Sequence, residues 1–342
     1  MYKVVKEGKG NIVARIVADS KNTNGGRITT FELEYHRYIH SEVMTHRLFS
    51  RNAMSSRAVP VKKMIEQVEN SPATPIHWGA AQSGMQAAAE CNNDINHYST
   101  GGRNEGEYAP QEYWELLAGT MASCAGEMLS AGYHKQIVNR ILEPFQMMKV
   151  VLTATEFDNF FWLRCDKDAQ PEIQELAGLM YQAMEESNPE LLKAGEWHTP
   201  YVDHERREGE LYYIVDEDYR HVTQEEAIAI SSSCCAQVSY RNIDNSFDKA
   251  MNVYERLGIG GEGKVHASPF EHTATPMKFY TGLDVAHNKL KVGDDINQDT
   301  ELWETGITHL DREDNFWSGN FKGFVQHRQL LENHTCYKYE KQ

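Results

Sequence analysis

The chain lacks the features that would mark a disulfide scaffold, a zinc protein or a membrane protein. Its six cysteines are scattered, with no Cys-x-x-Cys pair, so we interpret them as reduced thiols of a cytoplasmic protein. No apolar run approaches the roughly 18 residues of a membrane span, and the N-terminal residues lack the apolar core of a signal peptide. The 15 histidines show no metal-ligand spacing. We therefore expect neither a metal nor a membrane partner.

Positive charge is also scarce. Lys and Arg number 34 against 50 Asp and Glu, which gives a net charge of -16. A general nucleic-acid binder would present a basic face, so we expect no nucleic-acid partner. A single phosphorylated small molecule needs only a local positive site and stays compatible with this balance.

One short stretch departs from the acidic background. Residues 45–57 hold three arginines, a histidine, an asparagine and three serines. Arginine matches phosphate oxygens with two parallel hydrogen bonds, and serine hydroxyls can complete such a cradle. This composition favours an anionic ligand, although an ordinary solvated loop has a similar one.

Periodicity predicts a mixture of strands and helices. Alternating β-rich residues predict a strand over 27–35, followed by helices over 36–49 and 59–68. Residues 71–110 are rich in Pro and Gly, which predicts an insertion or mobile loop. Further along the chain we expect a buried strand over 148–155 and a charged surface connection over 203–222. The remaining helices are predicted at 111–131, 134–142, 171–187, 224–240 (after Thr223 as N-cap) and 246–257.

Several residues outside that stretch have both a structural and a functional interpretation. Arg140 stands near a predicted helix end, where offsetting the helix dipole is the structural interpretation. Arg164 follows an aromatic run and needs an acceptor, either a structural carboxylate or a ligand carbonyl or phosphate. Ser268-Pro269 is typical of a helix start, and helix N-termini hold anions. Cys234 and Cys235 offer no sign of activation, so we expect them to be buried.

Four spaced motifs together resemble the flavin-dependent thymidylate synthases. His46-Arg47, seven residues and Ser55 match that family's signature spacing, and Arg140-Ile-Leu-Glu-Pro resembles a second motif. Asn159-Phe160 with Leu163-Arg164, and Ala169-Gln170 with Glu172-Ile173, resemble two more.

The order of the motifs differs from that of the family. Segments resembling the family's early motifs, Cys235 to Tyr240 and His266 to His272, come late in this chain. The resemblance therefore implies an α+β fold, a central sheet flanked by helices, in circularly permuted form. We expect a catalytic domain over 1–284, with 71–110 as an insertion, and a C-terminal extension of unknown role over 285–342.

The resemblance also implies ligands and roles. Family members use FAD, NADPH and methylenetetrahydrofolate to convert dUMP to dTMP, in tetramers whose active sites lie at subunit interfaces. Arg164 matches the catalytic residue that contacts the uracil. The other positions that match dUMP contacts are Ser55, Ser56, Arg57 and Arg140, and those that match FAD contacts are His46, Arg47, Asn52, Asn159, Ser239, His266, Ser268 and Glu271.

Four positions depart from the family pattern. Thr45 and Ala53 stand where the family has charged residues, and Thr155 and Asp168 replace an arginine and a histidine. These departures leave two alternatives open. One is hydroxymethylation of dUMP on the same scaffold, and the other is a nucleotide- or flavin-binding protein without catalysis.

Overall fold

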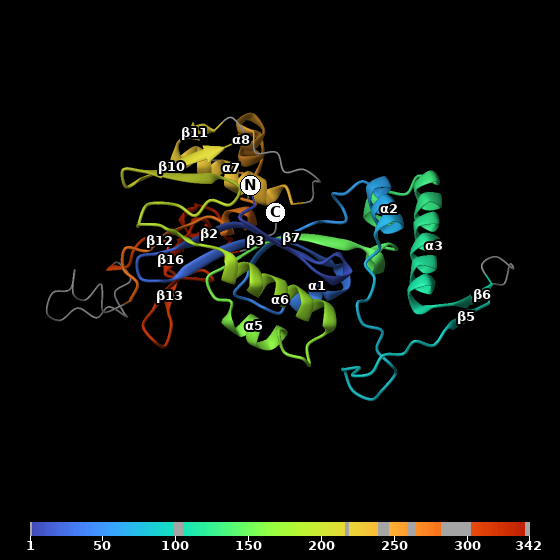
Figure 1. Cartoon of the computed structure of the whole chain (residues 1–342). Helices are drawn as coiled ribbons and strands as arrows, with labels where there is room; N and C mark the ends of the chain where they lie inside the picture. The colour runs from blue at the N-terminus through green and yellow to red at the C-terminus, as the bar shows by residue number, and fades with distance from the viewer. Residues whose placement is uncertain are drawn as a thin grey trace.

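A central, largely antiparallel sheet organises the molecule (Figure 1). The structure is a computed structural model that describes residues 2–98, 105–215, 219–238, 246–258, 265–281 and 302–338. The sheet has the order β1-β2-β3-β7-β4, and β8 pairs in parallel with β2. Its strands are β1 (Val4–Glu7), β2 (Val13–Lys21), β3 (Arg27–His36), β4 (Ser50–Ala53), β7 (Met147–Ala154) and β8 (Glu190–Leu191). The strands predicted over 27–35 and 148–155 are confirmed.

The two faces of the sheet differ in chemistry because side chains alternate along each strand. On β3, Phe31, Leu33 and Tyr35 join the main apolar core, which also contains Ile173 and Leu176 of α6 (Pro171–Glu186). The residues that alternate with them include Thr30 and Glu32, which are fully buried on the opposite face. One face therefore carries the hydrophobic core, and the other carries a buried polar layer.

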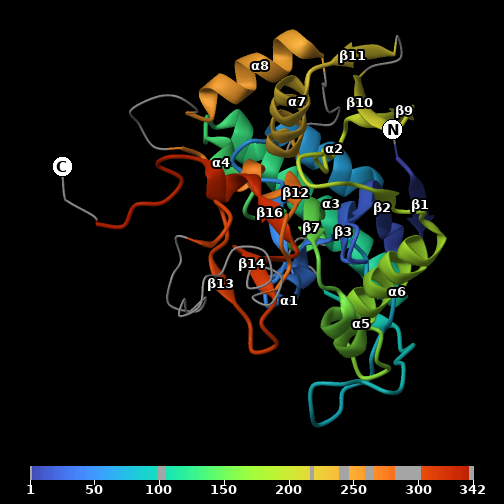
Figure 2. The ribbon, with the colours of Figure 1, turned by 90° about the vertical axis from the view of Figure 1, so that its left-hand side faces the viewer.

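Helices cover both faces. α5 and α6 lie on one side of the sheet, and α7 and α8 lie on the other (Figures 1 and 2). The described part contains eight α-helices, of which five have ten or more residues. The eight are α1 (His40–Val43), α2 (Val61–Asn70), α3 (Pro110–Ser130), α4 (Lys135–Val138), α5 (Asp158–Arg164), α6 (Pro171–Glu186), α7 (Gln224–Ala236) and α8 (Phe247–Arg256).

Several helix predictions are confirmed by local signals. Pro171 opens α6, and Thr223 caps α7 by accepting from the backbone N–H of Glu226, whose side chain accepts from the backbone N–H of Thr223. This reciprocal capping box satisfies donors that a helix start otherwise leaves unpaired. Cys234 and Cys235 are fully buried in α7, as expected.

The helix predicted over 36–49 is wrong. The chain forms a 3-10 turn, η2 (Arg37–Ile39), then the single turn α1, and continues as irregular chain to Ser50. The predicted helix over 134–142 is likewise reduced to α4 and following turns. The 42–49 segment instead folds against α5, where Phe49 packs on Phe157 and Phe160. Tertiary packing of these rings overrides the weak helical pattern.

The charged segment 203–222 is also not a simple surface connection. It forms a three-stranded antiparallel sheet of β9 (Asp203–Arg207), β10 (Glu210–Val215) and β11 (Arg220–Val222). Tyr213 and Val215 of this sheet pack in a core with Ala227 and Ile230 of α7. This three-stranded sheet thus helps to hold α7 in place.

The predicted insertion 71–110 is mostly irregular where it is described. Its regular parts are the short strands β5 (Ile95–His97) and β6 (Gly106–Tyr108), after which α3 begins. α2 and α3 pack side by side at one end of the sheet (Figure 1), around Val61, Met64 and Ala122.

The described part of the C-terminal extension packs into the rest of the fold. β12 (Ala274–Pro276) pairs with β16 (Phe324–Gln326), and β13 (His309–Leu310), β14 (Phe316–Ser318) and β15 (Phe321–Lys322) form a small sheet beside it. Phe321 and Phe324 are fully buried against Ile28 and Ala274. The predicted boundary at 284/285 lies outside the described residues. Within them, none of the helices combines the length and apolar character that crossing a membrane requires.

Candidate active site

Arg164 is the centre of a polar cluster between α5 and the segment that follows α1. It is the last residue of α5. Its Nε donates to His46 Nε2 at 3.0 Å, one terminal nitrogen donates to Glu42 Oε2 at 3.2 Å, and the other donates to Thr45 Oγ1 at 3.4 Å. The arginine therefore has a carboxylate partner, one of the two acceptors that its sequence context predicts.

The surroundings of His46 keep its ring neutral. The ring meets Phe160 edge-on, with 4.8 Å between ring centroids, and stacks near Phe49 at 5.7 Å. Burial, together with the positive charges of Arg164 and Arg51, lowers the pKa of His46 to about 4. At neutral pH the unprotonated ring can accept the hydrogen bond from Arg164.

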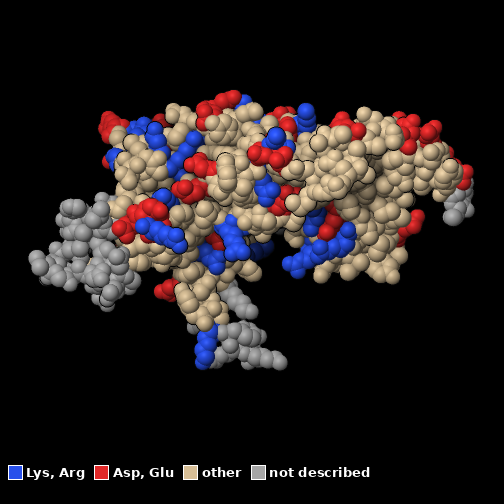
Figure 3. Space-filling view, turned by 90° about the horizontal axis from the view of Figure 1, so that it is seen from below, with Lys and Arg blue, Asp and Glu red and all other residues tan. Residues whose placement is uncertain are grey.

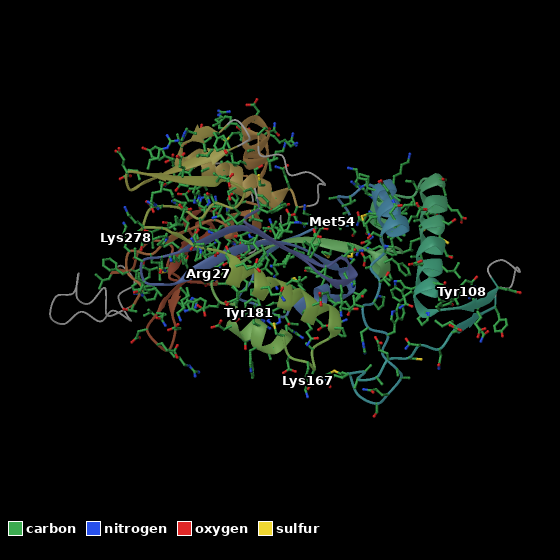
Figure 4. All side chains as sticks on the ribbon, viewed as in Figure 1. Arg27, Met54, Tyr108, Lys167, Tyr181 and Lys278 are labelled. Atoms are coloured by element: carbon green, nitrogen blue, oxygen red, sulfur yellow. The ribbon has the colours of Figure 1, made fainter. Side chains whose placement is uncertain are left out.

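Arg164 and Glu42 line a cavity of about 860 Å³. One wall is the loop between α5 and α6, and the opposite wall is part of the predicted insertion, residues 75–90. Gln86 in that wall donates from Nε2 to the carbonyl of Asp168 at 3.0 Å, so the insertion is tied to the α5–α6 loop. Figure 4 shows Lys167, another lining residue, at the lower edge of the molecule beside this segment.

The other predicted dUMP residues gather at a different place, where the chain leaves β4. Ser56 is buried, and its carbonyl accepts from Asn139 Nδ2 at 2.7 Å. This bond holds the Ser55–Arg57 loop against the segment that carries Arg140. Arg57 is exposed, and Arg140 pairs with Glu143 at 2.9 Å on the surface.

Arg164 and the residues that flank the Ser55–Arg57 loop line separate cavities. Met54 and Ala58, which flank the Ser55–Arg57 loop, line a cavity of about 440 Å³ together with Lys63 and Lys149. Arg164 lines the larger cavity instead. Figure 4 labels Met54 at the end of the sheet that faces α2, well separated from Lys167. Within one chain, Arg164 is therefore not gathered with the four other predicted dUMP residues.

Lys and Arg side chains collect near the middle of the face seen from below (Figure 3), although the chain as a whole is acidic. Asp and Glu side chains lie among and beside these basic ones in the same view, so the charge of this face is mixed.

The predicted FAD residues come from several segments, and two of these, 46–52 and 266–271, approach each other beside β4. Asn52 of β4 is buried and donates from Nδ2 to the carbonyl of Cys235 at 3.1 Å, at the end of α7. His272, directly after η4 (Ser268–Glu271), lies 2.8 Å from Thr153 Oγ1 of β7 through its Nδ1. These two bonds bring the late motifs against the early ones.

The remaining predicted FAD residues are mostly exposed. Arg47, Asn159, His266 and Ser268 all have exposed side chains, while Ser239 lies outside the described residues. The predicted helix start at Ser268 is wrong, because η4 is a four-residue 3-10 turn that begins after Ala267 without a side-chain cap. The anion-binding helix terminus expected there is therefore not formed.

Sequence reasoning missed several residues of this region. Glu42 binds Arg164, and Arg328 forms an ion pair with Glu271. Arg51 belongs to the arginine-rich stretch 45–57, but its structural role was not predicted: it donates to the carbonyls of Val43 and His46 at 3.0 and 3.1 Å. An acidic residue one turn from a histidine is ordinary helix composition, and Arg328 stands in a tail without a recognisable pattern, so neither carried a signal.

The buried thiols are poorly suited to nucleophilic chemistry. Burial raises the pKa of the Cys235 thiol well above its usual value, followed by the effects of Cys234 and Glu32. A thiolate is the nucleophilic form of cysteine, so Cys235 is a poor nucleophile.

Comparison with known proteins places part of this chain in a family. No curated protein matches the chain. Residues 27–190, which include Arg164, His46 and the Ser55–Arg57 loop, match the family model Thy1, described as thymidylate synthase complementing protein. This part of the chain is therefore a Thy1 domain, the domain of the flavin-dependent thymidylate synthases.

Proposed function

We propose that the protein is a flavin-dependent thymidylate synthase. It converts dUMP and methylenetetrahydrofolate, with NADPH as reductant, to dTMP and tetrahydrofolate. Membership of the Thy1 family suggests an enzyme of thymidylate synthesis. The observation that carries the finer proposal is the position of Arg164, a cation held by His46 and Glu42 at the wall of the large cavity.

The role of Arg164 follows from its chemistry. Donors placed at a pyrimidine carbonyl stabilise negative charge that develops on the ring, and this raises the nucleophilicity of C5. His46 is neutral and therefore does not change the charge around Arg164. The carboxylate of Glu42 offsets part of the positive charge of Arg164. His46 and Thr45 fix two of the guanidinium nitrogens, so that Arg164 is orientated before the substrate arrives.

The exposed polar residues of the predicted FAD set are chemically suited to a flavin nucleotide. Arg47, Asn159, His266 and Ser268 have polar side chains at the surface, and these are groups that hydrogen-bond flavin and phosphate oxygens. We propose that they hold FAD together with His46, Asn52, Ser239 and Glu271. When bound, the flavin supplies the hydride chemistry, and the protein residues bind and orientate the reactants.

The separation of Arg164 from the Ser55–Arg57 loop supports a shared site. Arg164 lines one cavity, whereas Met54 and Ala58, which flank the Ser55–Arg57 loop, line another. We propose that a second copy supplies the missing half, in a homotetramer with interfacial sites. Arg164→Ala and Arg57→Ala variants, each inactive alone, should partly regain turnover when unfolded and refolded together. No recovery would contradict this arrangement.

We further propose that the motif order reflects a circular permutation. The Asn52–Cys235 and Thr153–His272 contacts support it, since they join the displaced motifs to the early ones. The check is an experimental structure superposed on a flavin-dependent thymidylate synthase. One rotation must superpose residues 46–57 and 266–272 together, and failure to do so would reject the permutation.

The activity is tested directly with purified protein, dUMP, methylenetetrahydrofolate, FAD and NADPH. We expect dTMP by mass spectrometry, and no product when NADPH is omitted. Absence of any C5-alkylated nucleotide would overturn the proposal. Tight dUMP binding without turnover or flavin reduction would instead support a binding protein without catalysis.

Hydroxymethylation of dUMP is the second candidate, and Thr45 and Ala53 motivate it. Thr45 places a hydroxyl beside Arg164 where the family pattern has a charge, and Ala53 provides no carboxylate. Both reactions alkylate C5, so the mass of the product decides between them. A product that carries one additional oxygen atom, taken from isotopically labelled water, would replace methylation as the conclusion.

A further inference from the structure

The C-terminal extension reaches into the region of the predicted flavin residues. Gln326 of β16 is almost fully buried. Its Nε2 lies 3.3 Å from Ser50 Oγ at the start of β4 and 3.4 Å from the carbonyl of Glu271 in η4. One side chain of the extension therefore connects the two motif segments, which are more than 200 residues apart in sequence.

Asn320 adds a second connection from the same extension. It lies in the turn between β14 and β15, beside the buried Phe321. Its Nδ2 donates to the carbonyl of Leu48 at 2.9 Å and to Ser50 Oγ at 3.0 Å. It also accepts from Gln326 Nε2 at 2.9 Å. The end of the His46–Ser50 segment is thus held by amide groups from the extension.

Arg328 supplies the charged contact. It forms an ion pair with Glu271, and both side chains are largely buried, with exposed fractions of 28% and 19%. Its other terminal nitrogen donates to the carbonyl of His334 at 3.3 Å. The carboxylate of Glu271 therefore has a fixed direction and a neutralising partner.

We propose that Arg328 is a positioning residue of the cofactor site, and that Asn320 and Gln326 complete its frame. The identity of the ligand as FAD rests on the proposed function. The physical reason is charge. FAD carries an anionic pyrophosphate, and an unpaired carboxylate among its contacts would repel it. Arg328 offsets the charge of Glu271 and holds its carboxylate still.

The test compares three variants. Arg328→Gln removes the charge and keeps a polar side chain, and Arg328→Lys keeps the charge. Arg312→Gln is the matched control, because Arg312 is an exposed residue of the same extension. Three quantities are measured: FAD affinity by flavin fluorescence, dUMP affinity by calorimetry, and amide hydrogen exchange of residues 268–272.

For Arg328→Gln we expect FAD affinity to fall roughly tenfold or more, the size expected for losing a charge-assisted hydrogen bond. Exchange at residues 268–272 should rise, and dUMP affinity should stay unchanged. Arg328→Lys should restore part of the FAD affinity, which a purely structural loss would not allow. Arg312→Gln should match the wild type in all three measurements.

Two results would overturn the inference. One is equal FAD affinity and equal exchange in Arg328→Gln and Arg312→Gln. The other is a parallel loss of FAD and dUMP affinity with a lower melting temperature, which means general destabilisation. If the wild type binds no FAD, the proposed function fails, and faster exchange confined to residues 268–272 still supports the positioning role.

Discussion

Arg164 Nε donates a hydrogen bond to His46 Nε2 over 3.0 Å. Because Nε2 is then the acceptor, the ring proton must sit on Nδ1. This bond joins the end of α5 to the chain after α1, two segments more than 100 residues apart. The pKa of His46 falls to about 4 because burial disfavours the imidazolium. The nearby guanidinium groups of Arg164 and Arg51 disfavour it further.

Replacing Arg164 should affect both turnover and this histidine. For Arg164→Ala we expect turnover to fall by about 10²-fold or more, as for the loss of a donor that stabilises developing charge. The pKa of His46 should rise, because one of the cations that lowers it is gone. Turnover assays and NMR titration of the histidine ring measure the two effects.

Arg164→Lys is the control for charge. It keeps the cation near His46, so the pKa of His46 should stay low, while the lost hydrogen-bond geometry should still reduce turnover. A His46 pKa in Arg164→Ala equal to that of the wild type would contradict the coupling. Unchanged turnover in the same variant would contradict the catalytic role.

The fold should lose stability in mild acid. Burial lowers the pKa values of His40, His46 and His327 to about 4 and that of His272 to about 3, and it lowers that of His198 well below the usual value. Between about pH 6.5 and pH 4 the unfolded chain binds protons that the folded protein does not. The free energy of unfolding should therefore fall as the pH falls through this window.

The slope identifies the groups responsible. Each such histidine contributes up to about 1.4 kcal/mol per pH unit. Urea unfolding at several pH values should give a smaller slope for His327→Asn than for the wild type. His221→Asn, the same substitution at an exposed position, is the matched control. Stability independent of pH across the window would contradict the argument.

The C-terminal extension should be required for folding stability. Phe321 is fully buried against Ile28 of β3 and Ala274 of β12. Phe321→Ala should cost about 3–5 kcal/mol of unfolding free energy, the usual range for a large core truncation. Tyr337→Ala, at a position 89% exposed in the same extension, should change it by less than about 0.5 kcal/mol. Equal costs would mean that Phe321 is not part of the core.

Local signals explain which elements could be predicted from sequence. α6 and α7 have regular apolar spacing and clear starts, at Pro171 and Thr223. The prediction of a surface connection over 203–222 is wrong because Glu208-Gly209 resembles part of a charged loop. Both residues have positive φ, 50° and 90°, and they form the two-residue turn of the β9–β10 hairpin. Such turns favour this conformation, so the signal was present.

The site could be predicted only where a motif marked it. His46, Arg164 and the Ser55–Arg57 loop stand in recognisable patterns, but their grouping depends on tertiary structure. The bond from Gln326 to Ser50 spans 276 positions. Its two residues have no periodic or compositional relationship, so no local pattern could reveal it. No local pattern relates Arg328 to Glu271 either. The two residues flank the paired strands β12 and β16, and this pairing brings them together.

A row of buried, hydrogen-bonded side chains lies on one face of the sheet, and the stability of the fold should depend on each hydroxyl in it. Thr153 Oγ1 lies 2.7 Å from Thr30 Oγ1 and 2.8 Å from His272 Nδ1. Thr30 continues the row to His198 Nε2 at 2.8 Å, and His198 Nδ1 reaches Ser20 Oγ at 2.9 Å. All five side chains are essentially inaccessible to solvent, so each polar atom depends on its neighbours.

Thr153→Val keeps the shape of the side chain and removes the hydroxyl. His272 Nε2 has no hydrogen-bond partner within the described ranges, so the substitution would leave neither ring nitrogen paired. We expect a loss of about 1–3 kcal/mol in the free energy of unfolding, the cost of a buried polar group without a partner. Thr153→Ser is the matched variant, because it keeps the hydroxyl and loses only a methyl group. If urea unfolding shows that the serine variant is the less stable of the two, packing rather than hydrogen bonding governs this position.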